Sequence, residues 1–124
     1  MKFDANAPIW LQVMTDLETG ILSGRHPPGS KLPGGRDLAQ LYTINPNTAA
    51  RVYQELERKG LCETRRGLGT FVTEDQERFS ALREEQAHLA MDQFLSRMAL
   101  LGFSREAAVN YLEKEVSTCS KASM

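Results

Sequence analysis

The sequence predicts a mainly α-helical protein with one small β-hairpin, in which an N-terminal module is followed by a helical C-terminal region. Apolar residues recur at helical spacing in five segments, and the pattern changes to that of strands only between residues 61 and 74. Residues 1–73 carry a net charge of +2, whereas residues 74–124 carry −3. This change of sign is expected if only the first part faces a polyanion.

The first predicted helix covers residues 8–24. Pro8 suits its first turn, where a backbone N–H is not needed, and Gly24 suits its C-terminal stop. Gly20 lies inside this helix, where glycine costs about 1 kcal/mol relative to alanine, so we expect close packing at that position. The apolar residues lie on one helical face: Trp10, Val13, Met14, Leu17 and Ile21.

A loop rich in proline and glycine follows at residues 25–35, and Lys31-Leu32 within it is expected to form a very short strand. The next segment, residues 36–42, is predicted to be a short helix. Its inward side chains are expected to be Leu38, Leu41 and Tyr42.

The third predicted helix begins after Asn45 and ends at Gly60. Asn45 is a strong N-cap, and Pro46 fills the first helical position, where no N–H is required. The first turn carries only short polar side chains, so the leading end of the helix is narrow. The buried face is expected to consist of Ala49, Val52, Tyr53 and Leu56.

A β-hairpin is predicted next, with strands at residues 61–64 and 70–73 and a tip at residues 65–69. The tip contains Gly67 and Gly69, which adopt positive φ without steric cost and allow another backbone to approach closely. The aromatic residues Tyr53, Trp10 and Phe71 are expected in the core of the N-terminal module.

The C-terminal region is predicted to contain a long helix from Asp75 to about Leu101 and a last helix at residues 105–116, capped by Ser104. Two such helices cannot enclose their own apolar stripe, so a symmetric second copy is the simplest cover. The expected domains are residues 1–74, a dimerisation region at 75–117 and a disordered tail at 118–124. The expected dimerisation residues are Phe79, Leu82, Ala87, Ala90, Met91, Phe94, Met98, Leu101, Tyr111 and Leu112.

Several function classes are not supported by the residues. Cys62 and Cys119 form no CxxC and have no histidine at metal-ligand spacing, and His26 and His88 are isolated, so we expect reduced thiols, no metal and no cofactor. There is no nucleophile–base pair and no paired carboxylates, so an enzyme is not expected. No apolar run is long enough to span a membrane and no secretory signal is visible, which makes a cytoplasmic location the default expectation.

The order helix, helix, tight turn, helix, hairpin is the winged helix-turn-helix layout, in which the third helix enters the DNA major groove and the hairpin contacts the flanking backbone or minor groove. A narrow leading end on the third helix suits that role, since bulky side chains would hold the backbone away from the bases. The residues expected to contact DNA on these grounds are Asn47, Thr48, Arg51, Arg65 and Arg66. Arg51 could instead pair with Glu55, and the wing arginines could be edge charges that prevent aggregation.

These features together resemble the N-terminal domain of GntR-family bacterial transcription regulators over about residues 8–73. The landmarks are Gly-x-x-x-Pro-Gly-x-x-Leu-Pro from Gly24 to Pro33, Arg-Asp-Leu-Ala from Arg36, Leu-Glu-x-x-Gly-Leu from Leu56, and Arg-Gly-x-Gly-Thr-Phe-Val from Arg66. The short two-helix tail resembles the YtrA-type subfamily, whose small C-terminal region dimerises. The resemblance implies that the DNA contacts also include Arg36, Asn45, Gly67 and Gly69.

The sequence departs from the family pattern in two places. Gly34-Gly35 stands where the family usually has a serine and then a larger residue, so a weaker helix cap is expected there. Ala50 stands where many members carry arginine, so Arg51 is expected to make part of the DNA contacts that this arginine makes in those members.

The function expected from the sequence is a DNA-binding transcription regulator, a repressor that binds a pseudo-palindromic double-stranded operator as a homodimer. The alternative is a winged-helix module that binds another protein through the wing and the third helix. The C-terminal region is too short for a large sensing domain. The sequence leaves open whether a small-molecule effector acts on the chain.

Overall fold

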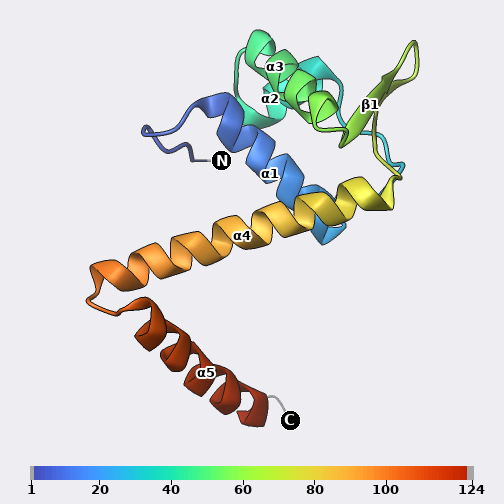
Figure 1. Cartoon of the computed structure of the whole chain (residues 1–124). Helices are drawn as coiled ribbons and strands as arrows, with labels where there is room; N and C mark the ends of the chain where they lie inside the picture. The colour runs from blue at the N-terminus through green and yellow to red at the C-terminus, as the bar shows by residue number, and fades with distance from the viewer. Residues whose placement is uncertain (1, 123–124) are drawn as a thin grey trace. The chain divides into compact units, whose positions relative to one another are not determined.

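The computed structural model describes residues 2–122, with side chains described up to residue 118, and it divides into two compact units, Met1–Arg83 and Glu84–Met124. The long helix α4 passes from the first unit into the second (Figure 1). The elements, in chain order, are α1 (Ile9–Ser23), α2 (Gly35–Tyr42), α3 (Pro46–Arg58), β1 (Cys62–Arg65), β2 (Gly69–Val72), α4 (Gln76–Leu100) and α5 (Arg105–Ala122).

The first unit is a winged helix-turn-helix fold in which α1 and α2 both pack against α3. Its fully buried side chains come from three helices, from β2 and from the segments beside the hairpin. Each large one contributes about 1.5–3 kcal/mol by leaving water. The largest of them include Leu17, Ile21, Leu32, Leu38, Leu56 and Leu61. All four residues predicted for the inner face of the third helix are buried.

The first turns of α4 complete this core. Phe79 and Leu82, which the sequence analysis assigned to dimerisation, are buried in the same hydrophobic cluster as α1 and α3. The sequence stripe continues without a break from residue 79 to residue 101, so periodicity alone could not separate the part that serves this core.

Gly20 has the packing role that its position predicted. A Cβ built on Gly20 would lie 2.5 Å from Cδ2 of His26, and the His26 N–H donates to the Gly20 carbonyl at 2.9 Å. The chain after α1 therefore folds back over the helix at the one position that has no side chain. Gly24 ends α1 with φ of 87°, as expected for a C-terminal glycine.

Helix α2 differs from its prediction on one face. Leu38 and Ala39 are buried, but Leu41 is 67% exposed, so its inward assignment was wrong. In a helix of only eight residues the buried face is narrow and is centred on the side that meets α3. Gly34 is the N-cap of α2, and because glycine has no side chain, no side-chain hydrogen bond caps this helix.

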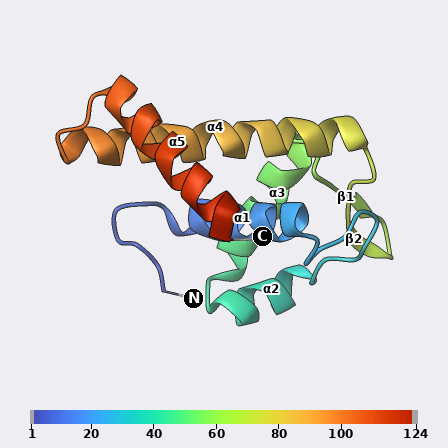
Figure 2. The same ribbon diagram turned by 90° about the horizontal axis from the view of Figure 1, so that it is seen from below.

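The hairpin pairs β1 and β2 in antiparallel register from Cys62 opposite Val72 to Arg65 opposite Gly69. The short strand expected at residues 31–32 is present as a single bridge between Lys31 and Phe71, and the Leu32 N–H donates to the Thr70 carbonyl at 2.8 Å. Figure 2 shows this preceding segment, in cyan, beside β2 at one end of the first unit.

The second unit contains the rest of α4 and all of α5. Gly102, with φ of 92°, ends α4, and the Ser104 hydroxyl caps α5 by accepting the Ala107 N–H at 3.1 Å. Ala108 is 1% exposed, and the rings of Phe103 and Tyr111 meet edge to face at 5.5 Å. Most large apolar side chains of this unit are exposed: Leu89, Met91, Leu100, Leu101, Val109, Tyr111, Leu112 and Val116.

The predicted dimerisation residues of this unit lie on both helices. Phe94 and Met98 are half-buried, whereas the others are exposed: Ala87, Ala90, Met91, Leu101, Tyr111 and Leu112. Helix α5 continues to Ala122, so part of the stretch expected to be a disordered tail is helical, and residues 123–124 lie outside the described part of the chain. Among the described residues, none of the helices combines the length and apolarity needed to cross a bilayer.

Candidate nucleic-acid interface

The leading end of α3 is capped from within. The Asn45 side-chain oxygen accepts the Asn47 N–H at 2.8 Å, and Pro46 at the first position has no N–H to satisfy. The Thr48 and Ala49 N–H groups both donate to the Asn45 carbonyl, at 2.9 and 3.1 Å. Since these backbone donors are already used, direct contacts from this turn to DNA must come from side chains.

The side chains available at this end are short. Asn47 and Ala50 are exposed and Thr48 is half-buried, so nothing bulky projects from the first turns. Asn45 uses one lone pair of its side-chain oxygen in the cap, so its amide NH₂ is the group better placed to bind a further partner. The surface expected from the sequence is therefore present, with a more restricted role for Asn45.

Arg51 follows on the exposed side of α3 and stacks on an aromatic ring. Its guanidinium carbon lies 4.2 Å from the centroid of the Trp10 ring, at the start of α1. Glu55, the alternative partner considered from the sequence, instead pairs with Arg58 at 2.6 Å. Trp10 itself is half-buried at the edge of the core, where we expected a core residue.

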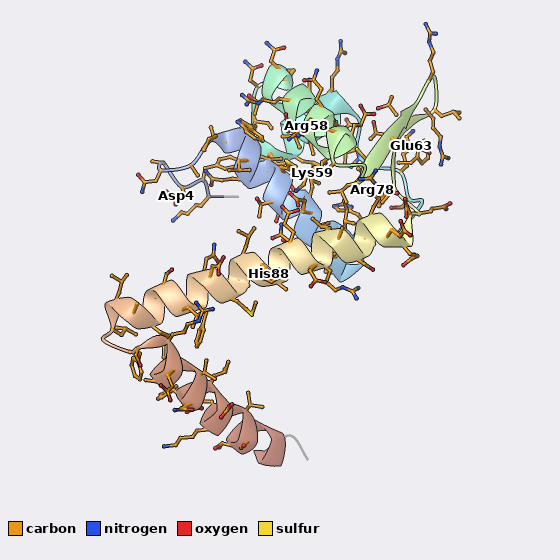
Figure 3. The ribbon with its side chains drawn as sticks, in the orientation of Figure 1. Asp4, Arg58, Lys59, Glu63, Arg78 and His88 are labelled. Carbon is orange, nitrogen blue, oxygen red and sulfur yellow. The ribbon has the colours of Figure 1, made fainter. Side chains whose placement is uncertain are left out.

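The other end of α3 is also attached to α1. The Lys59 ammonium lies 3.1 Å from Oε2 of Glu18. Figure 3 labels Lys59 at the end of α3. Glu18 is 3% exposed, so the ion pair with Lys59 compensates a carboxylate that is largely removed from water. Gly60 then turns the chain with φ of 75°, and a Cβ on it would lie 2.9 Å from Nε of Arg78.

Arg36 lies close to the leading end of α3. It is the second residue of α2, it is exposed, and it makes no ion pair within residues 2–118. Together with Ile44 and Pro46 it lines a shallow hollow between α2 and the start of α3. The fold therefore brings an unpaired guanidinium beside the helix end that the sequence predicted to meet the bases.

The two wing arginines have different surroundings. Arg65 stacks over the Phe71 ring at 4.4 Å and pairs with Glu63 at 2.9 Å. Arg66 is exposed at the tip and makes no ion pair with any residue in the described part of the chain. Phe71, expected in the core, lies half-buried on the outer face of the hairpin under Arg65.

The two wing glycines also differ. Gly67 has φ of 78° and open space where a Cβ would stand, so only its backbone conformation favours glycine. Gly69 has φ of 122°, and a Cβ there would lie 2.6 Å from Cε of Lys31. The Lys31 side chain therefore lies across Gly69, and this exposed cation was not among the residues predicted to contact DNA.

The residues that the sequence missed depend on contacts between distant segments. The short strand containing Lys31 was expected, but nothing in the sequence showed that it would pair with β2 and lay Lys31 on Gly69. Trp10 fits an apolar helical face, and no signal along the chain connects it with Arg51.

The groups with shifted pKa values do not contribute charge to this surface. Burial, assisted by Glu57, raises the pKa of Cys62 to about 12, so its thiol stays protonated. Burial and nearby Arg25 lower the pKa of His26, which keeps the imidazole neutral at pH 7. The positive charge of the first unit at neutral pH therefore comes from lysine and arginine side chains. Among the described residues no cluster of three His, Cys, Asp or Glu could hold a metal ion.

The sequence of this chain matches known regulators over most of its length. A model of bacterial regulatory proteins of the gntR family matches residues 10–72. The chain is 36% identical to the uncharacterized HTH-type transcriptional regulator YhcF of Bacillus subtilis over 105 residues, which is 85% of this chain and 87% of that protein. It is 35% identical to the HTH-type transcriptional repressor YtrA of the same organism over 94 residues, 71% of this chain and 72% of that protein.

Solved structures agree with this result. A GntR-family transcriptional regulator from Listeria monocytogenes superposes with a TM-score of 0.79 at 35% identity, covering 90% of this chain and 98% of that one. The DNA-binding domain of AraR, crystallised with operator ORX1, superposes with a TM-score of 0.52 at 28% identity over 54% of this chain and 81% of that one.

Proposed function

This chain belongs to the gntR family of bacterial regulatory proteins, and from that membership we propose that it represses transcription by binding a pseudo-palindromic operator as a homodimer. The observation that carries the proposal is the narrow, internally capped leading end of α3, with exposed Arg36 and Arg51 beside it. In a helix-turn-helix protein this end of the third helix meets the base edges in the major groove.

Binding strength is assigned mainly to phosphate contacts. Among the exposed cations around the leading end of α3 and along the wing, Arg36, Arg66 and Lys31 make no ion pair within the described residues, and each phosphate that they neutralise releases condensed counterions. Affinity should therefore fall steeply with salt. Arg65 forms an ion pair with Glu63, so we expect it to contribute less to phosphate binding than Arg66.

Specificity is assigned to the exposed side of α3. Asn47 and Thr48 can donate to or accept from base edges, and Arg51 can bind the acceptor atoms of guanine or a phosphate oxygen. The wing contributes shape recognition, because arginine is favoured in a narrow minor groove and Gly67 allows close approach of its backbone.

The homodimer is supported by the second unit. Its exposed apolar side chains would be covered by the same surface of a second copy, which gives a closed two-fold assembly. Two recognition helices related by that axis would meet half-sites about 34–36 Å apart on one face of the duplex. The assignment as a repressor is based on the similarity to YtrA of Bacillus subtilis, which is named a transcriptional repressor.

The experiment that tests this proposal is selection of bound sites from a pool of random duplexes with the full-length protein. We expect enrichment of a two-fold symmetric motif, and one dimer on each duplex by analytical ultracentrifugation. Enrichment of an asymmetric motif by a monomer would refute the dimer, and no enrichment at low salt would refute specific DNA binding. A promoter carrying the selected motif should then be less active when the protein is present.

A further inference from the structure

Helix α3 is attached to α1 at two places. The Arg51 guanidinium stacks on Trp10 toward the leading end, and Lys59 pairs with Glu18 at the other end. The two contacts are separated by eight residues in α1 and by eight residues along α3, so the helices run in the same direction where they meet. The contact at the far end is a largely buried ion pair, whereas the contact near the DNA-facing end is an exposed arginine on a half-buried ring.

The stacked geometry leaves the guanidinium able to bind. Arginine carries five N–H donors in the plane of its guanidinium, and an aromatic ring covers a face of that plane rather than its edge. A free arginine side chain has about 2 kcal/mol of rotamer entropy, part of which is lost when it binds. An arginine that already rests on a ring loses less when its edge meets an acceptor oxygen.

Packing alone does not require an aromatic residue at position 10. The fully buried residues of the α1 face are Val13, Leu17 and Ile21, and Trp10 lies beyond them at the edge of the core. A leucine could fill that edge. Within residues 2–118, the Trp10 ring is the contact that the structure records for the Arg51 side chain.

We propose that Trp10 is a positioning residue for DNA recognition: its indole ring holds the Arg51 guanidinium beside the leading end of α3 with the N–H edge free for the duplex. This inference rests on the proposed function. Trp10 contacts no DNA in this scheme and acts through Arg51. A half-buried residue of the first helix thus contributes to affinity through the third helix.

The test is a double-mutant cycle measured on the duplex recovered by selection with the wild-type protein. Trp10→Leu should weaken binding about two- to fivefold, because the Arg51 side chain, once released from the ring, would lose more rotamer entropy on binding the duplex. Trp10→Phe keeps a ring and should stay within about twofold of wild type. When Arg51→Met is already present, Trp10→Leu should cause no further loss.

Fluorescence gives an independent measurement, because Trp10 is the one tryptophan in the chain. Its emission should change when the selected duplex is added to the wild-type protein, and the change should be absent in Arg51→Met. Circular dichroism melting of each variant establishes that the first unit remains folded.

The outcomes separate this inference from the proposed function. The positioning role would be overturned if Trp10→Leu lowered the affinity for the duplex equally in the wild-type and Arg51→Met backgrounds. It would also be overturned if Trp10→Phe lowered the affinity as much as Trp10→Leu. Neither result would affect binding by the wild-type protein. Full binding by Trp10→Leu would overturn it as well. If the wild-type protein enriches no duplex, the proposed function fails and the positioning role fails with it.

Discussion

The two compact units differ in how far their apolar side chains are buried. In the first unit the large aliphatic residues converge on one core, and the exposed ones, such as Leu41 and Leu68, are scattered. In the second unit the exposed apolar residues lie on both helices, and only Ala108 among the described side chains is buried. The first unit is therefore stabilised by its own buried core. The second unit buries little by itself, so its stability depends on what covers its exposed apolar side chains.

The largest expected effect breaks the first unit. Leu56→Ala removes a side chain that is 0% exposed and should lower the free energy of unfolding by about 2–5 kcal/mol, through lost burial and a residual cavity. Urea denaturation followed by circular dichroism measures this change. The matched control is Leu101→Ala in the second unit, where the residue is 73% exposed. An equally large loss of free energy for unfolding of the first unit in that variant would contradict the difference drawn between the two units.

The next largest effect is dissociation of the proposed homodimer. Leu101→Glu places a charge on the apolar surface of the second unit and should raise the dimer dissociation constant by about a hundredfold, because that carboxylate would be buried without a partner. Sedimentation equilibrium measures the constant. Leu41→Glu makes the same change at a similarly exposed leucine of the first unit and should leave the dimer intact; dissociation by both variants alike would argue against a dimer through the second unit.

A smaller effect concerns charge. Lys31→Ala should weaken binding of the selected duplex and reduce the slope of log affinity against log salt by about 0.9 for each phosphate that is no longer neutralised. Fluorescence anisotropy titrations at several salt concentrations measure the slope. Lys114→Ala in the second unit removes an exposed lysine from the acidic half and should leave the slope unchanged. An unaltered slope in Lys31→Ala would remove Lys31 from the interface.

The smallest effect is a pH dependence within the first unit. Burial, then Arg25, lowers the pKa of His26 below the ordinary 6.5, and Asp16 opposes this only in part. Because the unfolded chain takes up the proton more readily, His26 contributes stability above pH 6.5 that is lost as the pH falls through the lower folded-state pKa. His26→Asn should therefore reduce the dependence of the melting temperature on pH over this range. Equal slopes in wild type and His26→Asn would refute the assignment.

The sequence predicted those features that depend on neighbours along the chain. The Asn45 cap, the buried face of α3, the glycine stops and the order of the elements all follow from local geometry, and the structure has each of them. At the candidate site, the exposure of Arg36, Arg51 and Arg66 was predictable for the same reason. Their contacts with DNA remain predictions.

The features that could not be predicted are pairings between distant segments. Periodicity identifies the apolar face of a helix but not the element that covers it, so Leu41 was placed inside, and Phe79 was assigned to a partner copy rather than to its own core. The stacking of Arg51 on Trp10 and of Arg65 on Phe71 likewise depends on how α1 and β2 meet their neighbours.

The buried thiol at the start of β1 has a consequence for how this regulator responds to its surroundings. Electrophiles and peroxides react with the thiolate of cysteine, and with a pKa of about 12 Cys62 holds almost none at neutral pH. Oxidative stress should therefore leave the base of the wing chemically unaltered while the first unit is folded, and Cys62 should become reactive toward alkylating agents only when this unit opens.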